Sequence, residues 1–160
     1  MIFDFSRIKN SKNLLAFSGG VDSSALFFLL LNHKIDFDIA IVNYNTREQS
    51  KDEIEYALNL AKEYKKEIFI KDVKLENSSN FEKNARDIRY IFFEQIIKEN
   101  SYETLITAHQ LNDRLEWFLM QLSKGAGLVE LFGIREFEEK KDYKIFHLNL
   151  IYGVQELQTN

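Results

Sequence analysis

One hexapeptide, Ser-Gly-Gly-Val-Asp-Ser at residues 18–23, has the residue types and the spacing to bind phosphate. It joins a short apolar run at residues 14–17 to a longer one at residues 25–31, which predicts a strand that turns directly into a helix. Backbone N–H groups and the positive dipole end at such a helix start attract phosphate. We therefore predict nucleotide binding by Ser18, Gly19, Gly20, Val21, Asp22 and Ser23.

Asp22 distinguishes this loop from a P-loop, in which a lysine stands just before the Ser or Thr. Because a carboxylate repels a neighbouring phosphate, we expect a Mg²⁺ ion to bridge Asp22 and the phosphates. The alternative is a purely structural junction, since glycine tolerates the positive φ of a tight turn. The whole hexapeptide is more specific than its two glycines, and it favours the nucleotide.

A second group of candidate residues follows the apolar run at residues 105–108. If a helix begins near residue 110, then His109, Asp113 and Glu116 share one narrow sector, opposite the leucines. Two carboxylates beside a nucleotide can hold Mg²⁺ or recognise an ammonium group. The alternative is that Asp113 and Glu116 only complement the helix dipole. Their position after a strand in a sheet with a phosphate loop favours the functional role.

The elements that must position these residues alternate along the chain. Short β-rich runs at residues 14–17, 39–43, 68–73 and 105–108 are each followed by a segment with helical spacing. The alternation predicts an α/β fold with a doubly wound, mainly parallel, Rossmann-like sheet, whose ligand lies at the carboxyl ends of the strands. The charged stretch at residues 135–144 is expected to be a solvated surface turn.

The composition of the 160 residues fits one domain, because 45% are hydrophobic and 14 are Phe, enough for a sizeable core. The absence of Cys excludes disulfides, thiolate metal sites and thiol catalysis within this sequence. No apolar run approaches the roughly 20 residues that span a bilayer, so we expect a cytoplasmic chain without a membrane segment. The net charge of −4 is unfavourable for RNA binding, which depends on clustered Lys and Arg.

The hexapeptide resembles the pyrophosphate-binding loop of the N-type ATP pyrophosphatases, enzymes that split ATP between its α and β phosphates. Further motifs are similar, in the same order, to those of the tRNA(Ile)-lysidine synthetases. They are Val-Asn-Tyr-Asn-Thr-Arg at residues 42–47, Glu-Lys-Asn-Ala-Arg-Asp-Ile-Arg-Tyr at 82–90, Ala-His-Gln-Leu-Asn-Asp-Arg-Leu-Glu at 108–116 and Lys-Gly-Ala-Gly-Leu at 124–128. The departures from the family pattern, at Tyr44, Thr46, Gln110 and Lys124, remove no acid and no loop residue.

This resemblance implies a fold of the adenine nucleotide alpha hydrolase type and a reaction in two steps. ATP adenylylates the wobble cytidine of an isoleucine tRNA, and free L-lysine then displaces AMP to form lysidine. The implied cofactors are ATP and Mg²⁺, with Asp22, Asp113 and Glu116 as metal ligands. The implied catalytic residues are Asp22, Arg86, His109, Asp113 and Glu116, with Arg89 as the alternative to Arg86 for a cationic contact. A homodimer is compatible with the resemblance.

The similarity covers roughly residues 12–134 and fails beyond residue 145. We therefore expect a pyrophosphatase domain at residues 1–145 and a divergent or truncated tail at residues 146–160, without the RNA-binding part of the family. Apolar residues of that tail, such as Leu148, are expected either to extend the sheet or to remain exposed. Two other functions remain open. A thiolating pyrophosphatase is disfavoured by the absence of Cys, and the second is a catalytically silent ATP- or AMP-binding module.

Overall fold

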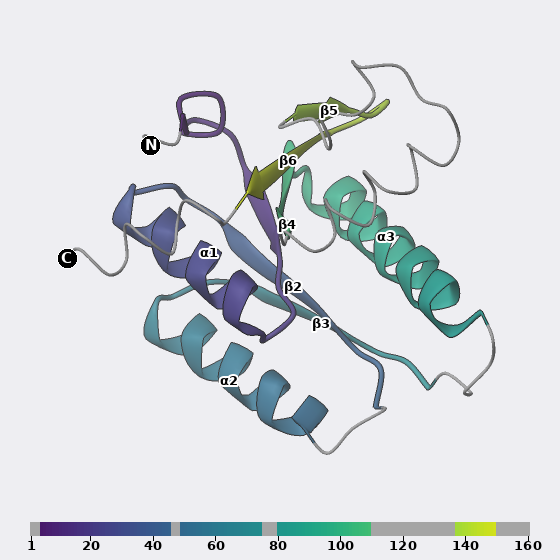
Figure 1. Cartoon of the computed structure of the whole chain (residues 1–160). Coiled ribbons are helices and arrows are strands. Elements are labelled where there is room, and N and C mark those ends of the chain that lie inside the picture. The colour runs from purple at the N-terminus through teal and green to yellow at the C-terminus, as the bar shows by residue number, and fades with distance from the viewer. Residues whose placement is uncertain (1–3, 46–48, 75–79, 110–136, 150–160) are drawn as a thin grey trace.

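The structure is a computed structural model that describes residues 4–45, 49–74, 80–109 and 137–149. Within these residues the chain forms a six-stranded sheet with the order β3-β2-β1-β4-β6-β5, and three helices pack on it (Figure 1). The strands are β1 (Asn13–Ala16), β2 (Asp38–Asn43), β3 (Ile68–Asp72), β4 (Thr104–His109), β5 (Phe137–Glu139) and β6 (Lys144–Asn149). The helices are α1 (Val21–Asn32), α2 (Gln49–Glu63) and α3 (Phe81–Asn100).

The sheet is parallel except at β5, which pairs antiparallel with β6. The chain runs outward from β1 through β2 to β3 and then returns to form β4 on the other side of β1. In an open α/β sheet, the point where the strand order reverses leaves a crevice at the carboxyl ends of the two strands. Here that crevice lies between β1 and β4. The predicted α/β, mainly parallel, doubly wound fold is confirmed.

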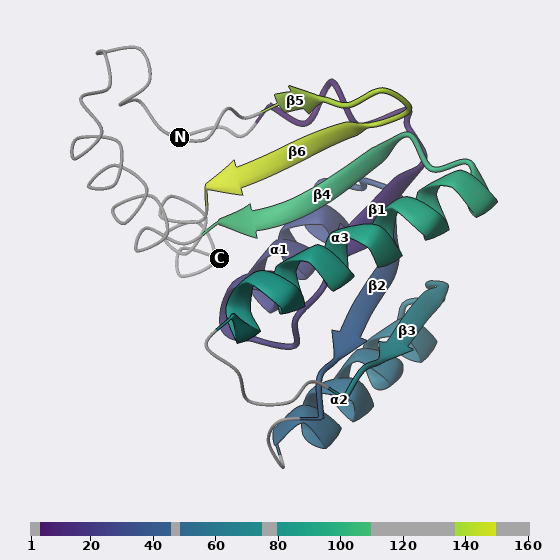
Figure 2. The ribbon, with the colours of Figure 1, turned by 90° about the vertical axis from the view of Figure 1, so that its right-hand side faces the viewer.

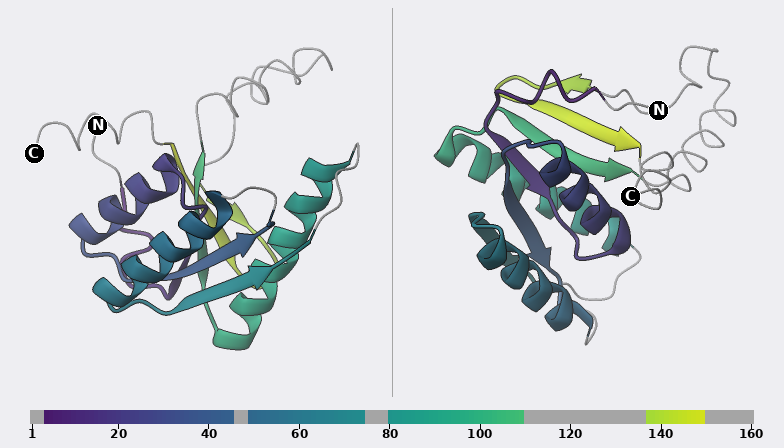
Figure 3. Two further views of the ribbon diagram at one scale, coloured as in Figure 1. Left: turned by 90° about the horizontal axis from the view of Figure 1, so that it is seen from below. Right: turned by 90° about the vertical axis from the view of Figure 1, so that its left-hand side faces the viewer.

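Helices cover both faces of the sheet, with α1 and α2 on one side and α3 on the other (Figure 3). Successive side chains of β1 belong to the two opposite layers. Leu15 is part of the core under α1 and α2, whereas Leu14 is part of the core under α3. Phe27 of α1 is fully buried, and its ring packs edge-on against Phe37 at 5.1 Å between centroids. This burial explains why α1 is apolar around most of its circumference.

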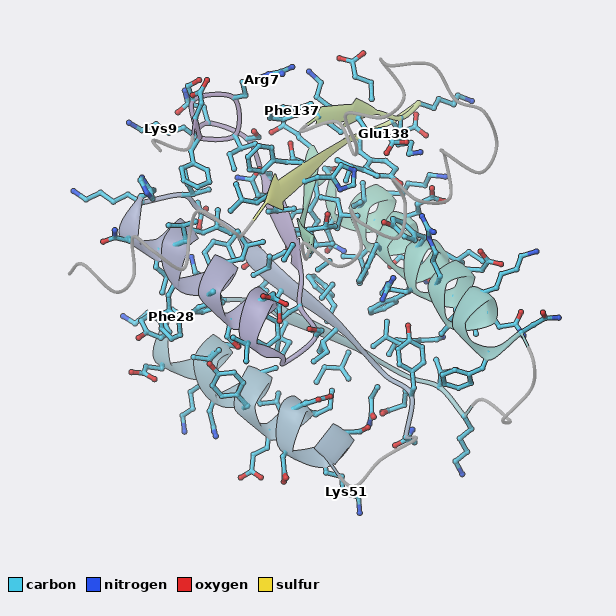
Figure 4. The ribbon with its side chains drawn as sticks, in the orientation of Figure 1. Arg7, Lys9, Phe28, Lys51, Phe137 and Glu138 are labelled. Atoms are coloured by element: carbon cyan, nitrogen blue, oxygen red, sulfur yellow. The ribbon has the colours of Figure 1, made fainter. Side chains whose placement is uncertain are left out.

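The charged stretch at residues 135–144 is only partly a turn, so this prediction needs correction. Residues 137–139 form β5, and the Phe137 ring packs on Phe146 with centroids 4.8 Å apart. The Arg7 guanidinium carbon lies 3.8 Å from the centre of the Phe137 ring, and both residues are labelled in Figure 4. Charged side chains are common on edge strands because they oppose pairing with other chains. Because the neighbouring residues are charged, the sequence pattern did not indicate that Phe137 anchors a strand here.

Strand β6 continues across residue 145, where the similarity to the lysidine synthetases was expected to end. Leu148 is buried in the core under α1, so this residue extends the sheet instead of remaining exposed. Phe146, the first residue of the predicted tail, is fully buried as well, whereas Leu150, Ile151 and Tyr152 lie outside the described residues. The division into residues 1–145 and 146–160 remains a prediction. Among the described helices, none has the length and hydropathy that crossing a membrane requires.

Candidate nucleotide-binding site

The loop at residues 18–23 connects β1 to α1 and is held in shape by its two serines. The Ser18 N–H donates to Ser23 Oγ at 3.1 Å, and the Gly20 N–H donates to Ser18 Oγ at 3.3 Å. Ser23 Oγ in turn donates to the Gly20 carbonyl at 3.3 Å and lies 3.0 Å from Ser18 Oγ. Ser23 is only 4% exposed. Its hydroxyl therefore fixes the loop from beneath, while Ser18 lies on the exposed side.

The two glycines of the loop have different structural roles. Gly19 has a φ of +79°, and a Cβ placed on it would lie 2.7 Å from Glu53 Cβ of α2, so both the backbone angle and the space require glycine. Gly20 is extended, with φ −80°, and a Cβ there would meet only Ser18 Oγ at 3.4 Å. The turn geometry thus accounts for Gly19 and leaves Gly20 without a structural requirement.

The N-cap residue of helix α1 provides no side-chain hydrogen bond to the start of the helix. Gly20 is its N-cap residue and provides no side-chain acceptor for the first-turn N–H groups of residues 21–23. The first N–H groups of a helix have no partner within the helix, and together with the dipole they attract an anion. Val21, at the first helical position, is 83% exposed, which leaves this helix start accessible. The predicted phosphate contacts of the loop are consistent with this geometry.

Two cavities open beside the loop at the carboxyl edge of the sheet, toward which the arrowheads of β4 and β6 point in Figure 2. The first, here called the β2 cavity, has a volume of about 310 Å³ and is lined by Phe17, Ser18, Ile41, Tyr44, Phe81 and Arg89, among others. The second, the β4 cavity, has a volume of about 330 Å³ and is lined by Ser18, Asp22, Ser23, Arg89, Tyr90 and Thr107, among others. The β4 cavity occupies the crevice where the strand order reverses.

Arg89 is the arginine that the structure brings to both cavities. Arg86, the arginine selected from the sequence, lines neither of them. Both are exposed on α3, and their guanidinium carbons lie 5.8 Å and 5.9 Å from the centre of the Tyr90 ring, Arg86 being the nearer. A cation between two cavities, beside an open helix start, is well placed for an anionic ligand.

Tyr44 fastens the carboxyl end of β2 to the beginning of α3. Its hydroxyl donates to the Ala85 carbonyl at 2.9 Å, and its ring packs edge-on against Phe81 with centroids 6.5 Å apart. Burial raises the pKa of Tyr44, although the nearby Arg89 charge opposes that shift. Tyr44 and Phe81 both line the β2 cavity, and Phe81 lies on α3, the helix that carries Arg89.

The predicted acidic cluster is only partly within the described residues. Asp22 lies in the first turn of α1 and lines the β4 cavity, where a carboxylate oxygen suits Mg²⁺. His109 is the last residue of β4, in register with Asn149, whereas Asp113 and Glu116 lie outside the described residues. Over the described ranges, no three His, Asp or Glu side chains gather as a ready metal site.

A polar chain that the sequence did not indicate runs from the β4 cavity to the edge of the sheet. Thr107 Oγ1 lies 2.9 Å from His147 Nδ1, and His147 Nε2 lies 3.4 Å from Glu138 Oε2. Thr107 and His147 are register partners in the parallel pair of β4 and β6. Only this pairing makes them neighbours, because 40 residues separate them in the sequence.

A parallel α/β sheet with a glycine loop before an uncapped helix, at the carboxyl edge of the strands, defines a nucleotide-binding domain. The chain belongs to the PP-loop domain family, whose profile matches residues 3–155 and whose members are ATP-binding domains. The family resemblance read from the motifs is confirmed.

Relatives and one solved structure extend this assignment. A tRNA(Ile)-lysidine synthase of Campylobacter jejuni (strain RM1221) is 51% identical over 95% of this chain and 47% of its own length. One of Helicobacter pylori (strain ATCC 700392 / 26695) is 54% identical over 86% of this chain and 41% of its own length. The chain thus spans about half the length of the synthases it matches. The structure of the U34-tRNA thiolase NcsA from Methanococcus maripaludis, with its 4Fe–4S cluster, matches 94% of this chain and 56% of its own, with a TM-score of 0.68 and 21% identity, which supports the fold.

Proposed function

We propose that this chain provides the ATP-dependent chemistry of lysidine formation on an isoleucine tRNA with a cytidine wobble base. The observation that carries this proposal is its identity of 51% to a tRNA(Ile)-lysidine synthase over 95% of its residues. The open start of α1, the Asp22 carboxylate and Arg89 support the ATP part of the reaction.

In the first step, the cytidine O2 attacks the α phosphorus of ATP and pyrophosphate leaves. The first-turn N–H groups of α1 bind the leaving phosphates, and Arg89 supplies a positive charge at the border of the two cavities. Asp22 would hold Mg²⁺, which when bound would supply positive charge beside the phosphates. Ser23 contributes indirectly, because its buried hydroxyl sets the loop conformation that presents these donors.

In the second step, the ε-amine of lysine forms a bond to C2 of the cytidine, the C2–O bond breaks, and AMP leaves. The acidic pair Asp113 and Glu116 is proposed to bind the substrate ammonium or the metal, on the basis of the family motif. His109, at the end of β4, is proposed to accept a proton from the attacking amine. Arg86, exposed on α3, is proposed to contact RNA phosphate.

The proposal also covers the location of the protein, its metal, its second substrate and its assembly. We propose a cytoplasmic location, Mg²⁺ as the metal, free L-lysine as the second substrate, and a homodimer as an assembly to test. Thiolation is the less favoured alternative, since the sequence contains no cysteine to carry sulfur or a cluster. A silent ATP- or AMP-binding module is the other alternative, and an assay of chemistry separates it from the proposed function.

The test joins this chain to the remaining part of a matched lysidine synthase and incubates the joined protein with Mg²⁺, ATP, radiolabelled lysine and isoleucine tRNA that carries a cytidine wobble base. We expect label in that tRNA, together with pyrophosphate release that depends on the tRNA. The chain alone should bind ATP but give little or no label, because its net charge of −4 is unfavourable for RNA binding. The same tRNA with uridine at the wobble position is the control and should remain unlabelled. Binding of ATP by the joined protein without either signal would support the silent module, and sulfur incorporation from a persulfide donor would support thiolation. Either result would contradict the proposed function.

A further inference from the structure

Thr107 lines the β4 cavity, and its hydroxyl is hydrogen-bonded to His147, which lies outside the cavity lining. Thr107 is 9% exposed and lines the cavity together with Asp22. The His147 side chain behind it is 8% exposed, and Glu138 of β5 contacts the far side of its ring. Glu138 also pairs with Lys140 (the labelled Glu138 lies on the edge strand in Figure 4). The chain Thr107–His147–Glu138 therefore joins the cavity to the surface.

The Glu138 contact determines which ring nitrogen of His147 carries the proton. An ionised carboxylate accepts hydrogen bonds only, so the nitrogen that faces Glu138 is the one that bears hydrogen, namely Nε2. In the neutral ring the other nitrogen, Nδ1, is then an acceptor. The 2.9 Å contact is consequently a bond in which the Thr107 hydroxyl donates to His147 Nδ1. Burial lowers the pKa of His147, which favours this neutral form.

A threonine hydroxyl has a single hydrogen, and here His147 takes it. The lone pairs of Thr107 Oγ1 can accept hydrogen bonds, but this oxygen cannot donate to a phosphate oxygen. Donors expected in this cavity under the proposed function are the waters on a Mg²⁺ ion, because Mg²⁺ usually keeps several of its waters when it binds carboxylates and phosphates. Asp22, on the same cavity, is the described carboxylate that would hold such an ion.

We propose that His147 is a positioning residue that holds Thr107 as a hydrogen-bond acceptor for water bound to the divalent cation at Asp22. This inference rests on the proposed binding of Mg²⁺ and ATP. It assigns a role to β6 and β5, which provide no residue to the family motifs described above. Thr107 contacts the bound ligand through the cation's water, and His147 acts only through Thr107.

The first test is a spectroscopic one on the ligand-free chain. The sequence contains three histidines, so the ¹⁵N spectrum of a histidine-labelled sample shows three imidazole rings. The signals that are missing from the spectrum of a His147→Phe variant are those of His147. We expect His147 as the Nε2–H tautomer, with an Nδ1 shift that changes in Thr107→Val because its hydrogen bond is lost. An Nδ1–H tautomer would overturn the proposal, since Thr107 would then keep its hydrogen for another partner.

The second test measures ATP affinity by calorimetry, with Mg²⁺ and again with a chelator. Thr107→Val keeps the shape of the side chain and removes the hydroxyl, whereas Thr107→Ser keeps the hydroxyl. We expect Mg²⁺·ATP affinity to fall about fivefold in Thr107→Val and in His147→Phe, and to remain at the parental value in Thr107→Ser. Affinity for metal-free ATP should be the same in all four proteins.

The outcomes separate this inference from the function on which it rests. If the parent binds ATP with Mg²⁺ and Thr107→Val binds it equally well, the inference is wrong and the proposed function stands. An equal loss of metal-free affinity in Thr107→Val would also overturn it, because the effect would not involve the cation. If the parent itself binds no ATP, the proposed function and the inference both fail. Should His147→Phe unfold, Thr107→Val and Thr107→Ser still decide the question.

Discussion

At the scale of single residues, the loop shows how two identical glycines can be selected for different reasons. Gly19 is required by its positive φ and by the approach of Glu53, both of which belong to the fold itself. Gly20 is under neither constraint. A bare backbone at the start of a helix allows close approach of a ligand, which is the remaining physical reason for a glycine there.

This contrast gives a matched pair of variants. Gly19→Ala should lower the free energy of unfolding by roughly 1–3 kcal/mol, because alanine at positive φ is strained and its Cβ would collide with Glu53. Gly20→Ala should change it by less than about 1 kcal/mol and instead weaken ATP binding. Urea unfolding and calorimetry measure the two effects. If Gly20→Ala bound ATP like the parent, the loop backbone would not approach the phosphates.

The two arginines of α3 form a second pair. Arg89→Leu should weaken ATP binding by about tenfold or more, since a charge-assisted hydrogen bond is worth about 1.5–3 kcal/mol. Arg86→Leu should leave the affinity within about twofold, because Arg86 lines neither cavity. Both substitutions change the net charge equally, so a difference between them reports position. Equal losses in titrations at two salt concentrations would contradict the assignment.

The sequence predicted the loop and Asp22 as parts of the nucleotide site, but it could not decide whether Arg86 or Arg89 contacts the ligand. Both occur in one motif on one helix, and the face that α3 turns to the sheet depends on how Phe93, Ile96 and Ile97 pack. Thr107 and His147 were missed for a related reason, because their contact depends on strand register across 40 residues. The chemistry of a residue is evident from the sequence around it, whereas its neighbours across a sheet depend on strand register.

At the scale of elements, the β-rich, mainly apolar runs of β1 to β4 were predicted as strands, whereas β5 and β6 were not. Runs in β1, β2, β3 and β4 are long enough to stand out, and the helical spacing of α2 and α3 is one-sided. β5 has three residues, two of which are glutamates, so its pattern resembles that of a solvated turn. Its stability comes from Phe137, whose ring contacts both the Phe146 ring and the Arg7 guanidinium.

The burial of His147 in β6 predicts a pH dependence of stability. Burial lowers the pKa of His147 below its ordinary value of 6.5, so the unfolded chain binds this proton more readily than the folded one. Stability is therefore full above about pH 6.5 and is lost as the pH falls through the folded pKa, by up to about 1.4 kcal/mol per pH unit.

Unfolding by urea at pH 7.5 and pH 5.0 measures this loss, with His147→Phe as the control in which it should shrink. The interval stays above the range of Glu138, whose pKa is lowered from 4.5, chiefly by the hydrogen bond with Lys140. An identical loss in His147→Phe would assign the effect to other titratable groups.

At the scale of the whole molecule, the order of the strands places the candidate chemistry. Two hydrophobic cores and two helical layers pack on one sheet, and the strand order of this sheet reverses between β1 and β4. The β4 cavity opens at that reversal. Alternating strands and helices predicted such an edge, but not which pair of strands would flank the crevice. That choice depends on β2 and β3 lying to one side of β1 and β4 to the other.

The most direct test of the account is the Mg²⁺-dependent binding of ATP to the parent and to Asp22→Asn, which keeps the shape of the side chain and removes its charge. Calorimetry on both, with and without a chelator, gives four affinities. We predict that Mg²⁺ strengthens ATP binding to the parent, and that Asp22→Asn loses this gain while its thermal unfolding is unchanged. Equal Mg²⁺-dependent affinity in the two proteins would contradict the assignment of the loop and Asp22 to a metal-bound nucleotide.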